Sequence, residues 1–295
     1  AEIHPQEVIL RLTGGKQFGM SEDDIIQCIK DIKNHDSLLI RGIHYFTGTQ
    51  KKLSKISEEI VFINQFCDNL KNDLSIDFSD IEYGPGLSFN YFSEQNEQEN
   101  YNEITQFTEF IKTSKYNFVI ELGRYIASSC GTYVTRVMDV KTNKTGNYCI
   151  IDGGINHINY YGQMMGMKVP SITQYSENET TESCDYTICG SLCTTADVVV
   201  REKKFKKLSE GDLLFFSNIG AYSITEGVYL FLSHPLPKVY IWDNNKLICV
   251  RDTMESYKIN SNQIYLKSFD CQITIFSSHI YLMLEMVNST NHVQD

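Results

Sequence analysis

Cys193 and Asp197 belong to a short pattern whose residue types could do chemistry. A strand-like apolar run, residues 185–189, ends in a Gly-Ser-Leu turn, and the cysteine follows this turn directly, with the acid four residues further on. A short turn of this kind holds the next side chain at a fixed angle, so that it can be presented to a bound molecule. A cysteine taken alone is as readily an inert buried thiol, and this pattern by itself leaves both interpretations open.

Three further segments, residues 42–50, 81–87 and 121–124, each look like the glycine-rich end of a β-strand. Glycines allow backbone N–H groups to approach an anion, and a helix that begins next to them adds a positive dipole. Arg124 adds a planar group that suits a carboxylate or a phosphate. Each segment alone is as well explained by an ordinary turn. Because ligands of parallel α/β units bind at the carboxyl ends of the strands, the three together predict a phosphate-bearing ligand.

The first part of the chain alternates strand and helix patterns that would position these segments. Strand-like runs cover residues 37–46, 74–83 and 115–121, and apolar stripes at helical spacing cover residues 21–34, 53–70 and 104–111. Ser21 and Asp24 are typical of the N-terminal cap of a helix. The alternation predicts parallel strands with right-handed crossovers, as in a barrel or a doubly wound sheet.

From about residue 131 onward the pattern changes to many short β-rich runs separated by Gly and Asn turns, which predicts an antiparallel β domain. The runs cover residues 133–140, 148–151, 198–201, 212–216, 238–242 and 247–251. Hairpin turns are expected at residues 143–146 and 244–245, and a short helical piece is expected near Gly162. The stretch 264–295 is apolar in places and carries no motif.

The overall composition limits the classes of partner. With 295 residues, 42% of them hydrophobic and 21% charged, the chain is long enough for two globular domains. A net charge of −11 argues against nucleic acid and anionic membranes, and no run is apolar enough to span a membrane. The nine cysteines are scattered without the spacing of a zinc site, which favours reduced thiols in a cytoplasmic protein and predicts no metal.

A series of segments, in order along the chain, resembles the fold-type III pyridoxal-phosphate (PLP) decarboxylases, the diaminopimelate/ornithine decarboxylase family. The matching segments are residues 17–20, 42–50, 84–86, 121–124, 152–156, 190–197, 211–212 and 220–222. The resemblance implies an α/β plus all-β fold. Residues 1–130 would be the C-terminal part of an alanine-racemase-like TIM barrel, a partial PLP-binding (β/α) barrel. Residues 131–295 would be an antiparallel, Greek-key-like C-terminal β domain.

The resemblance also implies roles for individual residues. Glu121 would face the pyridine nitrogen of PLP and keep it protonated, and Phe46 would stack on the ring. Cys193 would be the general acid that returns a proton to the substrate carbon across a dimer interface. The residues expected on the phosphate side of the cofactor are Thr49, Gly84, Gly86, Gly123, Arg124 and Tyr222. The residues expected to contact the substrate are Arg124, Thr194 and Asp197.

The chain departs from the family pattern in ways that bear on activity. The lysine that binds PLP lies near the start of the family's barrel, and no lysine here matches it. The chain is therefore expected to be a C-terminal portion of the enzyme that is inactive alone. Phe46 stands where the family has a ring-stacking histidine. Thr194 and residues 156–163 replace the family's contacts to the distal end of diaminopimelate.

The resemblance leaves three functions open. The first is PLP-dependent decarboxylation, by a homodimer, of an L-amino acid that is diaminopimelate-like or tethered to a carrier protein. The alternative is a non-catalytic homologue that acts as a binding or regulatory protein, which the missing lysine and histidine favour and the retained Glu121, Arg124, Cys193 and Tyr222 disfavour. A racemase on the same barrel would use a tyrosine as its second base, whereas the Cys193 motif favours decarboxylation.

Overall fold

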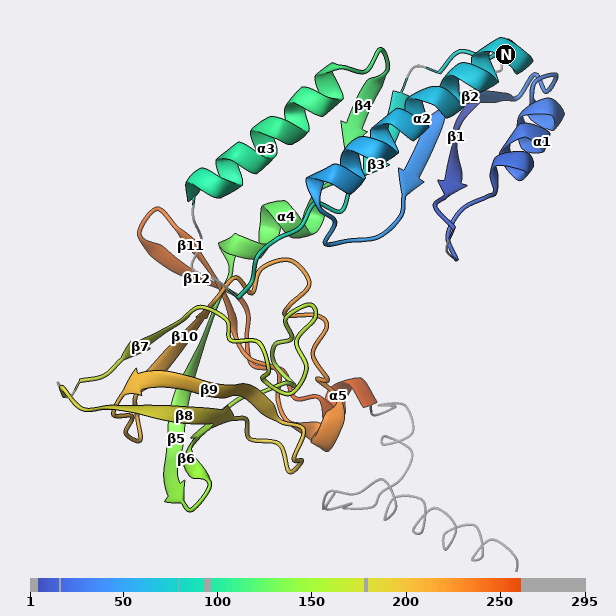
Figure 1. The fold of residues 1–295 in the computed structure, drawn as a ribbon. Helices are drawn as coiled ribbons and strands as arrows, with labels where there is room; N and C mark the ends of the chain where they lie inside the picture. Colours follow the sequence, from blue (N-terminus) through green and yellow to red (C-terminus); the bar gives the residue numbers. More distant parts are fainter. Residues whose placement is uncertain (1–4, 16, 79, 93–96, 178–179, 261–295) are drawn as a thin grey trace, which may run out of the picture. The chain divides into compact units, whose positions relative to one another are not determined.

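The computed structural model describes residues 5–15, 17–78, 80–92, 97–177 and 180–260, and Figure 1 shows their course. The chain divides into two compact units, Ala1–Thr132 and Tyr133–Asp295, and each is described by itself. The roles predicted for the two parts, a partial PLP-binding barrel and a C-terminal β domain, stay predictions. The stretch 264–295, in which no motif was found, lies outside the described residues.

The first unit is built on a four-stranded parallel sheet (Figure 1). Its elements are β1 (Gln6–Thr13), α1 (Glu22–Ile32), β2 (Leu38–Phe46), α2 (Leu53–Leu74), β3 (Asp80–Gly84), α3 (Glu97–Lys112), β4 (Asn117–Ile120), α4 (Gly123–Ala127) and the 3-10 turn η1 (Ser128–Cys130). The strands pair in chain order, β1-β2-β3-β4, and each neighbouring pair is parallel. The predicted alternation of parallel strands and helices is therefore confirmed.

Helix α1 begins where the sequence predicts, whereas α2 extends beyond the predicted apolar stripe over residues 53–70. The Ser21 hydroxyl accepts a hydrogen bond from the Asp24 N–H at 3.1 Å, and the Asp24 carboxylate accepts one from the Ser21 N–H at 3.3 Å, which completes a capping box. Helix α2 continues to Leu74 and stops at Ser75, whose φ of 53° is left-handed. The predicted strand over residues 74–83 is therefore wrong at its start, because β3 begins only at Asp80.

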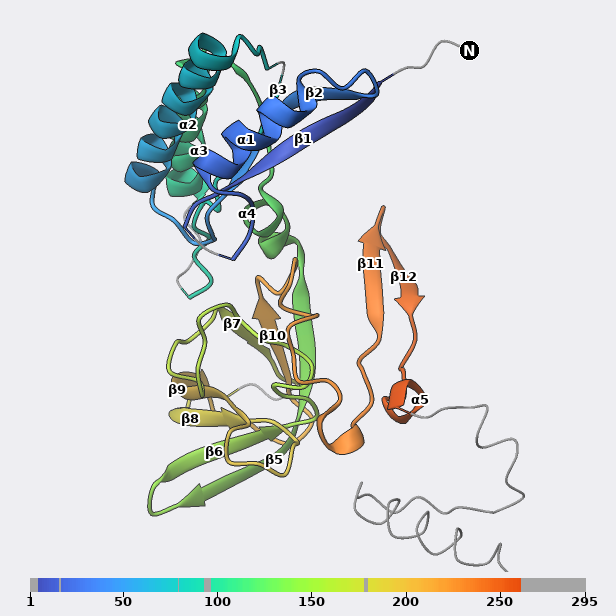
Figure 2. The same ribbon diagram turned by 90° about the vertical axis from the view of Figure 1, so that its right-hand side faces the viewer.

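The helices α1, α2 and α3 pack against the sheet through one apolar core, and Figures 1 and 2 show the three helices alongside the strands. Ile43 and Tyr45 of β2 are buried in this core. Because successive side chains of a strand point to opposite faces, His44 and Phe46 lie on the face turned away from the helices. Three of the predicted site residues, Phe46, Gly84 and Glu121, lie at the carboxyl ends of these strands.

The second unit is built on a six-stranded sheet of order β7-β10-β5-β6-β8-β9. Its elements are β5 (Thr132–Asn143), β6 (Gly146–Ile151), β7 (Ile172–Tyr175), β8 (Ser183–Cys189), β9 (Val198–Lys206), β10 (Leu213–Ser217), η2 (Phe231–Ser233), β11 (Val239–Asp243), β12 (Lys246–Arg251) and α5 (Tyr257–Asn260). Strands β6 and β8 are parallel, because the chain returns between them through residues 152–182. The predicted purely antiparallel domain is wrong at this pair, and the sheet is mixed. The Greek-key detail stays a prediction.

Both predicted hairpin turns are formed. Asn143 pairs with Gly146 between β5 and β6. Asn244 and Asn245 link β11 to β12 with φ angles of 46° and 62°, as in the tight turns that asparagine tolerates. The predicted helical piece near Gly162 is wrong, because residues 161–166 form turns in which several residues take positive φ.

Candidate active site

The carboxyl ends of β2 and β4 bring His44 and Glu121 together. His44 Nε2 lies 3.3 Å from Glu121 Oε2. Glu121 follows β4 directly, and its N–H donates to the Tyr83 carbonyl oxygen of β3 at 3.0 Å, so that the sheet fixes its position. The Glu121 side chain is 57% exposed, whereas that of His44 is 13% exposed. The carboxylate is therefore open to a ligand and suits a protonated nitrogen.

Phe46 and Gly84 are neighbours at the ends of β2 and β3. The two residues are paired in the sheet. A Cβ atom at position 84 would lie 2.8 Å from Cδ2 of the Phe46 ring and 3.5 Å from Oε2 of Glu121. The missing side chain thus leaves room for the aromatic ring beside the carboxylate. The structure brings together three of the predicted site residues, Phe46, Gly84 and Glu121.

The loops that follow β2 and β3 touch each other at Gly48, Thr49 and Gly86. A Cβ atom at position 86 would lie 2.0 Å from the Gly48 carbonyl oxygen and 2.8 Å from the Thr49 Cα, and Gly86 has a φ of 60°. The Lys51 N–H donates to the Gly86 carbonyl oxygen at 2.8 Å, which joins the two loops. Glycine is needed at 86 for both the close approach and the left-handed conformation. The two loops predicted for the phosphate are thus fixed against each other.

Arg124 is the second residue of α4 and is buried, with 9% of its surface exposed. Its Nη1 donates to Tyr91 Oη at 3.0 Å, and that hydroxyl lies 2.8 Å from Ser128 Oγ. Ser128 in turn donates to the Arg124 carbonyl oxygen at 2.6 Å. The guanidinium therefore takes part in an internal hydrogen-bond network. Its predicted contacts with phosphate and substrate, and that of Gly123 at the start of α4, stay predictions.

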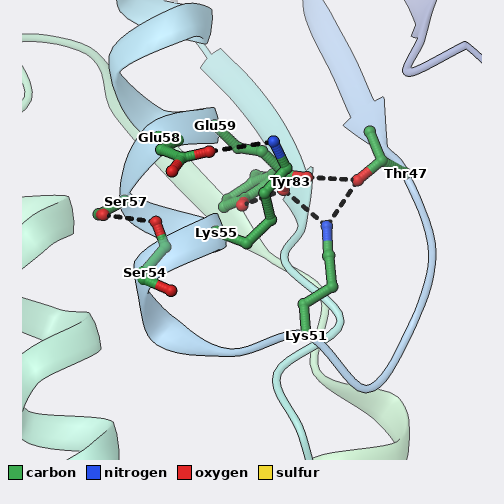
Figure 3. Close-up of polar contacts among 8 residues, drawn as sticks. All are labelled: Thr47, Lys51, Ser54, Lys55, Ser57, Glu58, Glu59 and Tyr83. Atoms are coloured by element: carbon green, nitrogen blue, oxygen red, sulfur yellow. Dashed lines mark hydrogen bonds and ion pairs between the residues drawn. The ribbon is translucent and has the colours of Figure 1, made fainter.

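A buried network that the sequence motifs do not contain lies next to the loop that carries Thr49 (Figure 3). Glu59 of α2 accepts hydrogen bonds from Thr47 Oγ1 at 2.5 Å, Lys51 Nζ at 2.6 Å and Tyr83 Oη at 2.7 Å. Lys51 Nζ also donates to Thr47 Oγ1 at 2.7 Å. Burial, together with the nearby Glu59 carboxylate, raises the pKa of Tyr83 far above its usual range. The network ties α2 and β3 to the loop after β2.

In the second unit, Asp197 holds the turn that carries Cys193. Its Oδ2 accepts the Leu192 N–H at 2.9 Å and its Oδ1 accepts the Ile155 N–H at 2.9 Å. Asp197 is 2% exposed, and this burial raises the pKa of its carboxyl while the two N–H groups act against the rise. Cys193 itself is exposed. Asp197 thus positions the cysteine turn, and its predicted contact with a substrate stays a prediction.

Thr194 and Tyr222 also lie in turns of the second unit. Thr194 Oγ1 accepts the Ala196 N–H at 3.3 Å inside the Cys193 turn. Tyr222 is 46% exposed and follows Ala221, which has a φ of 55°. Left-handed residues other than glycine are uncommon and often lie in functional loops. The predicted contacts of Thr194 with substrate and of Tyr222 with PLP stay predictions.

His157 is a titratable group of the second unit to which the motifs gave no role. Its Nε2 lies 3.0 Å from the Pro235 carbonyl oxygen, which can only accept, so Nε2 carries the proton. Its Nδ1 lies 2.9 Å from Tyr133 Oη and therefore accepts the tyrosine hydrogen. Burial lowers the pKa of His157 and favours its neutral form, while the bond to the Pro235 carbonyl oxygen acts against this fall.

Three features of the described residues limit what other sites they could form. No group of three or more His, Cys, Asp or Glu in that part of the chain could hold a metal ion. None of the helices described there has the length and apolarity that crossing a membrane requires. The eight cysteines of that part are free thiols.

Comparison with known proteins gives consistent matches. Residues 112–220 match the family described as pyridoxal-dependent decarboxylase, C-terminal sheet domain. The L-glutamyl-(BtrI acyl-carrier protein) decarboxylase of Niallia circulans is 27% identical over 268 residues, which are 86% of this chain and 62% of that protein. The 2-((L-alanin-3-ylcarbamoyl)methyl)-2-hydroxybutanedioate decarboxylase of Staphylococcus aureus is 28% identical over 75% of this chain and 58% of that protein.

Among solved structures, the diaminopimelate decarboxylase of M. jannaschii in complex with L-lysine has the same fold. Its TM-score is 0.74 at 19% identity, over 88% of this chain and 64% of that one. This chain thus spans less than two thirds of the length of these relatives. The resemblance that the motifs predicted is confirmed: residues 112–220 match the C-terminal sheet domain of the pyridoxal-dependent decarboxylases, and the chain is similar to the diaminopimelate and carrier-protein glutamyl decarboxylases.

Proposed function

We propose that this chain is part of a PLP-dependent decarboxylase that acts on an L-amino acid with an extended polar side chain. The observation that carries the proposal is the arrangement at the strand ends of the first unit. At the carboxyl ends of β2, β3 and β4 lie the exposed Glu121 carboxylate and the Phe46 ring. The loops that follow β2 and β3, which contact each other at Thr49 and Gly86, lie beside them. The similarity to pyridoxal-dependent enzymes supports the same cofactor.

The residues of the first unit fit PLP in chemistry. When bound, PLP accepts the electron pair that remains on the substrate carbon after CO2 leaves. Glu121 would hold a proton at the pyridine nitrogen, with His44 orienting its carboxylate from 3.3 Å. Phe46 would cover the ring. The backbone around Thr49 and Gly86 can approach a phosphate closely because no side chain at position 86 intervenes.

Cys193 of the second unit is proposed as the general acid. Its thiol is exposed and follows a turn that Asp197 fixes through two hydrogen bonds of 2.9 Å. A thiol carries a proton that it can donate to the substrate carbon as a general acid. A homodimer in the cytoplasm, with Cys193 serving the partner's site, is part of this proposal.

The names of the two relatives inform the substrate class. One acts on a glutamyl group attached to an acyl-carrier protein, and the other on an alanyl group joined to a larger acid through a carbamoyl link. Diaminopimelate is the substrate named for further relatives. We therefore propose two substrate classes. One is an amino acid attached to a larger molecule, either a carrier protein or a group joined through an amide link, and the other is a diaminopimelate-like compound.

A non-catalytic binding or regulatory protein remains the second candidate. One observation favours it: Arg124, predicted to contact phosphate, is buried and donates to Tyr91. If the guanidinium stays bound there, the cofactor site lacks its main cation. The chain would then keep the architecture of the decarboxylases without binding PLP.

Titration of the full 295-residue chain with PLP, followed by absorbance, separates the two candidates. The enzyme proposal expects saturable binding that Gly86→Ala weakens at least tenfold, because the new Cβ would lie 2.0 Å from a backbone oxygen. Glu109→Gln, an exposed change on α3, serves as the control and should leave binding unchanged. Absence of saturable PLP binding would favour the second candidate, the non-catalytic binding or regulatory protein.

Borohydride reduction of the PLP-treated chain, followed by intact-mass measurement, then tests whether a lysine takes up the cofactor covalently. The expected result for this chain is an unmodified mass of 33.9 kDa. A stable phosphopyridoxyl adduct on a single lysine would contradict the prediction that the chain is inactive alone. In a preparation that does decarboxylate, Cys193→Ala should lower turnover or the fidelity of protonation by about 10²–10⁴-fold, the range for a lost general acid.

A further inference from the structure

Gln50 lies in the loop after β2, residues 47–51, and has a left-handed backbone with a φ of 59°. This conformation is strained for residues other than glycine and persists only where the surrounding structure holds it. The motifs gave Gln50 no role, although Thr49 beside it is predicted to contact phosphate. The bonds of the Gln50 side chain explain why the strained conformation is kept.

The side-chain amide of Gln50 binds the main chain of Phe89, in the loop after β3, in both directions. Gln50 Nε2 donates to the Phe89 carbonyl oxygen at 2.8 Å, and the Phe89 N–H donates to Gln50 Oε1 at 2.6 Å. Because a carbonyl oxygen can only accept and an N–H can only donate, the two bonds fix which way the amide is turned. Phe89 is buried, so removal of the amide would leave two main-chain groups in need of new partners.

Neighbouring bonds join the same two loops. The Ser88 N–H donates to the Lys51 carbonyl oxygen at 3.1 Å. On the side of α2, Glu59 binds the Thr47 hydroxyl and the Lys51 ammonium (Figure 3). The loop after β2 is thus tied to α2 by Glu59 and to the loop after β3 by Gln50 and Lys51.

The Phe89 end of this connection leads to Arg124. The rings of Phe89 and Tyr91 pack edge to face, with their centroids 4.9 Å apart. Tyr91 Oη in turn accepts a hydrogen bond from Arg124 Nη1 at 3.0 Å. A displacement of Phe89 would therefore reach the arginine that is predicted on the phosphate side of the cofactor.

Three N–H groups of the two loops are available to a ligand. Within the part of the chain that the structure describes, the N–H groups of Gly48, Thr49 and Gly86 donate to no other group. The three residues are half-buried, and they adjoin one another where Gly86 meets the Gly48 carbonyl oxygen and the Thr49 Cα. Main-chain N–H groups that lie close together favour an anion. Their spacing depends on how the two loops are held.

We propose that Gln50 is a positioning residue for the phosphate of the cofactor. Its amide holds the loop after β2 against the loop after β3, so that the N–H groups of Gly48, Thr49 and Gly86 stay together as one site for the phosphate oxygens. Gln50 acts through the main chain of Phe89 rather than on the phosphate. Because the ligand is the PLP of the proposed function, on which this role rests, Gln50 determines how strongly the chain prefers a phosphorylated pyridine over an unphosphorylated one.

Isothermal titration calorimetry on the full chain distinguishes binding of the phosphate from binding of the ring. The probes are pyridoxamine 5′-phosphate, pyridoxamine, which lacks the phosphate, and inorganic phosphate, which lacks the ring. None of them carries an aldehyde, so none forms an imine with surface lysines. Gln50→Leu should weaken pyridoxamine 5′-phosphate and inorganic phosphate by the same factor, about tenfold, and should leave the affinity for pyridoxamine unchanged.

Gln65→Leu, the same change on the exposed surface of α2, is the matched control and should alter none of these affinities. Amide hydrogen exchange without ligand, measured by NMR, tests the loop connection in the same variants. In Gln50→Leu we expect the Phe89 and Ser88 amides to exchange about tenfold faster, because the two loops are no longer held together. An unchanged rate for the Ile63 amide, at a buried position of α2, shows that the variant is folded.

The role of Gln50 is overturned if Gln50→Leu weakens pyridoxamine as much as its phosphate, if it leaves both phosphate-bearing probes unchanged, or if the Phe89 amide keeps its exchange rate. Each of these results, with pyridoxamine 5′-phosphate still bound by the wild type, would leave the proposed enzyme standing. A wild type that binds pyridoxamine 5′-phosphate no more tightly than inorganic phosphate, both through Gln50, would keep the role and contradict the proposed cofactor. A wild type that binds neither phosphate-bearing probe would overturn both.

Discussion

Glu59 in the first unit and Asp197 in the second are both buried carboxylates that fix a loop of the candidate site, yet they do so with different partners. Glu59 is 4% exposed and Asp197 is 2% exposed. Glu59 is held by the side chains of Lys51, Thr47 and Tyr83, at 2.5–2.7 Å. Asp197 is held by two main-chain N–H groups at 2.9 Å.

This difference determines what is left behind when either carboxylate is removed. Loss of Glu59 would leave the Lys51 ammonium, which is 13% exposed, in a poorly solvated position without its counter-ion. Loss of Asp197 would leave uncharged N–H groups, whose desolvation costs less than that of an ammonium. The α/β unit therefore depends more strongly on its carboxylate than the β unit does, although both loops carry predicted site residues.

The largest expected effect is that of Glu59→Leu. Breaking a buried ion pair by removing one partner destabilises proteins by about 3–5 kcal/mol, and we expect this range here. The free energy of unfolding, measured by urea denaturation of the full chain, is the readout. The double variant Lys51→Met with Glu59→Leu should recover most of the loss, since well-packed apolar residues can replace a buried pair with little net cost.

The neighbouring Glu58 supplies a matched control. Its side chain is 68% exposed and pairs with Lys55 at 3.1 Å across one helical turn. Glu58→Leu should change the free energy of unfolding by less than about 1 kcal/mol, as is typical of surface pairs. Equal losses at positions 58 and 59 would show that the buried network contributes nothing special, and the contrast between the two units would disappear.

A smaller loss is expected for Asp197→Asn. Asparagine keeps the size of the side chain but replaces one acceptor oxygen with an NH2 group, so that either Ile155 or Leu192 loses its acceptor. The expected loss is about 1–3 kcal/mol. Burying the charged carboxylate is unfavourable, which is why the pKa of Asp197 is raised. The uncharged asparagine avoids this cost, and this gain opposes the loss. The alkylation rate of Cys193 by iodoacetamide should also change, because the turn is no longer fixed.

Asp185→Asn, an exposed change on β8, is the control for this variant and should leave both stability and the Cys193 alkylation rate as they are. An unchanged alkylation rate in Asp197→Asn would show that the Asp197 carboxylate does not fix the turn that carries Cys193. The geometry of that turn would then have to come from its own backbone hydrogen bonds, such as the Thr194 N–H to the Leu192 carbonyl oxygen at 2.8 Å.

The same pair of residues shows what the sequence could predict. Asp197 was found because it belongs to one short motif with Cys193, although its carboxylate turns inward to bind the main chain. Glu59 was missed because its partners lie 8, 12 and 24 residues away in sequence and match no motif. A signal existed: Glu59 sits on the buried stripe of α2 between Ile56 and Ile63, where a charge needs a partner.

Local patterns elsewhere were predicted well and long-range pairings less so. The Ser21–Asp24 capping box and the turn at Asn244 follow from the conformations that a few adjacent residues prefer. The parallel pairing of β6 with β8 depends on where a connection of some thirty residues leads the chain, which short-range periodicity does not encode. The fold class was therefore predictable, while the mixed sheet was not.

His157 gives the smallest expected effect and extends the comparison to pH. Burial lowers its pKa below the ordinary value of about 6.5, so the neutral form is favoured in the folded state. Its stabilising contribution is complete above pH 6.5 and is lost as the pH falls through the lowered pKa. Burial acts on Asp197 in the opposite direction, raising its pKa, so its contribution is complete at low pH and is lost as the pH rises through that raised value.

Thermal unfolding between pH 8 and pH 5 should therefore distinguish the contribution of His157 to stability from that of Asp197, because the two change with pH in opposite directions. We expect the wild-type melting temperature of the second unit to fall on acidification, and the fall to be smaller in His157→Gln, which cannot gain the proton. His35→Gln, at an exposed histidine, should follow the wild type. An equally steep fall in His157→Gln would mean that other groups govern acid sensitivity. The bonds of His157 to Tyr133 and Pro235 would then stabilise the second unit equally at every pH in this range.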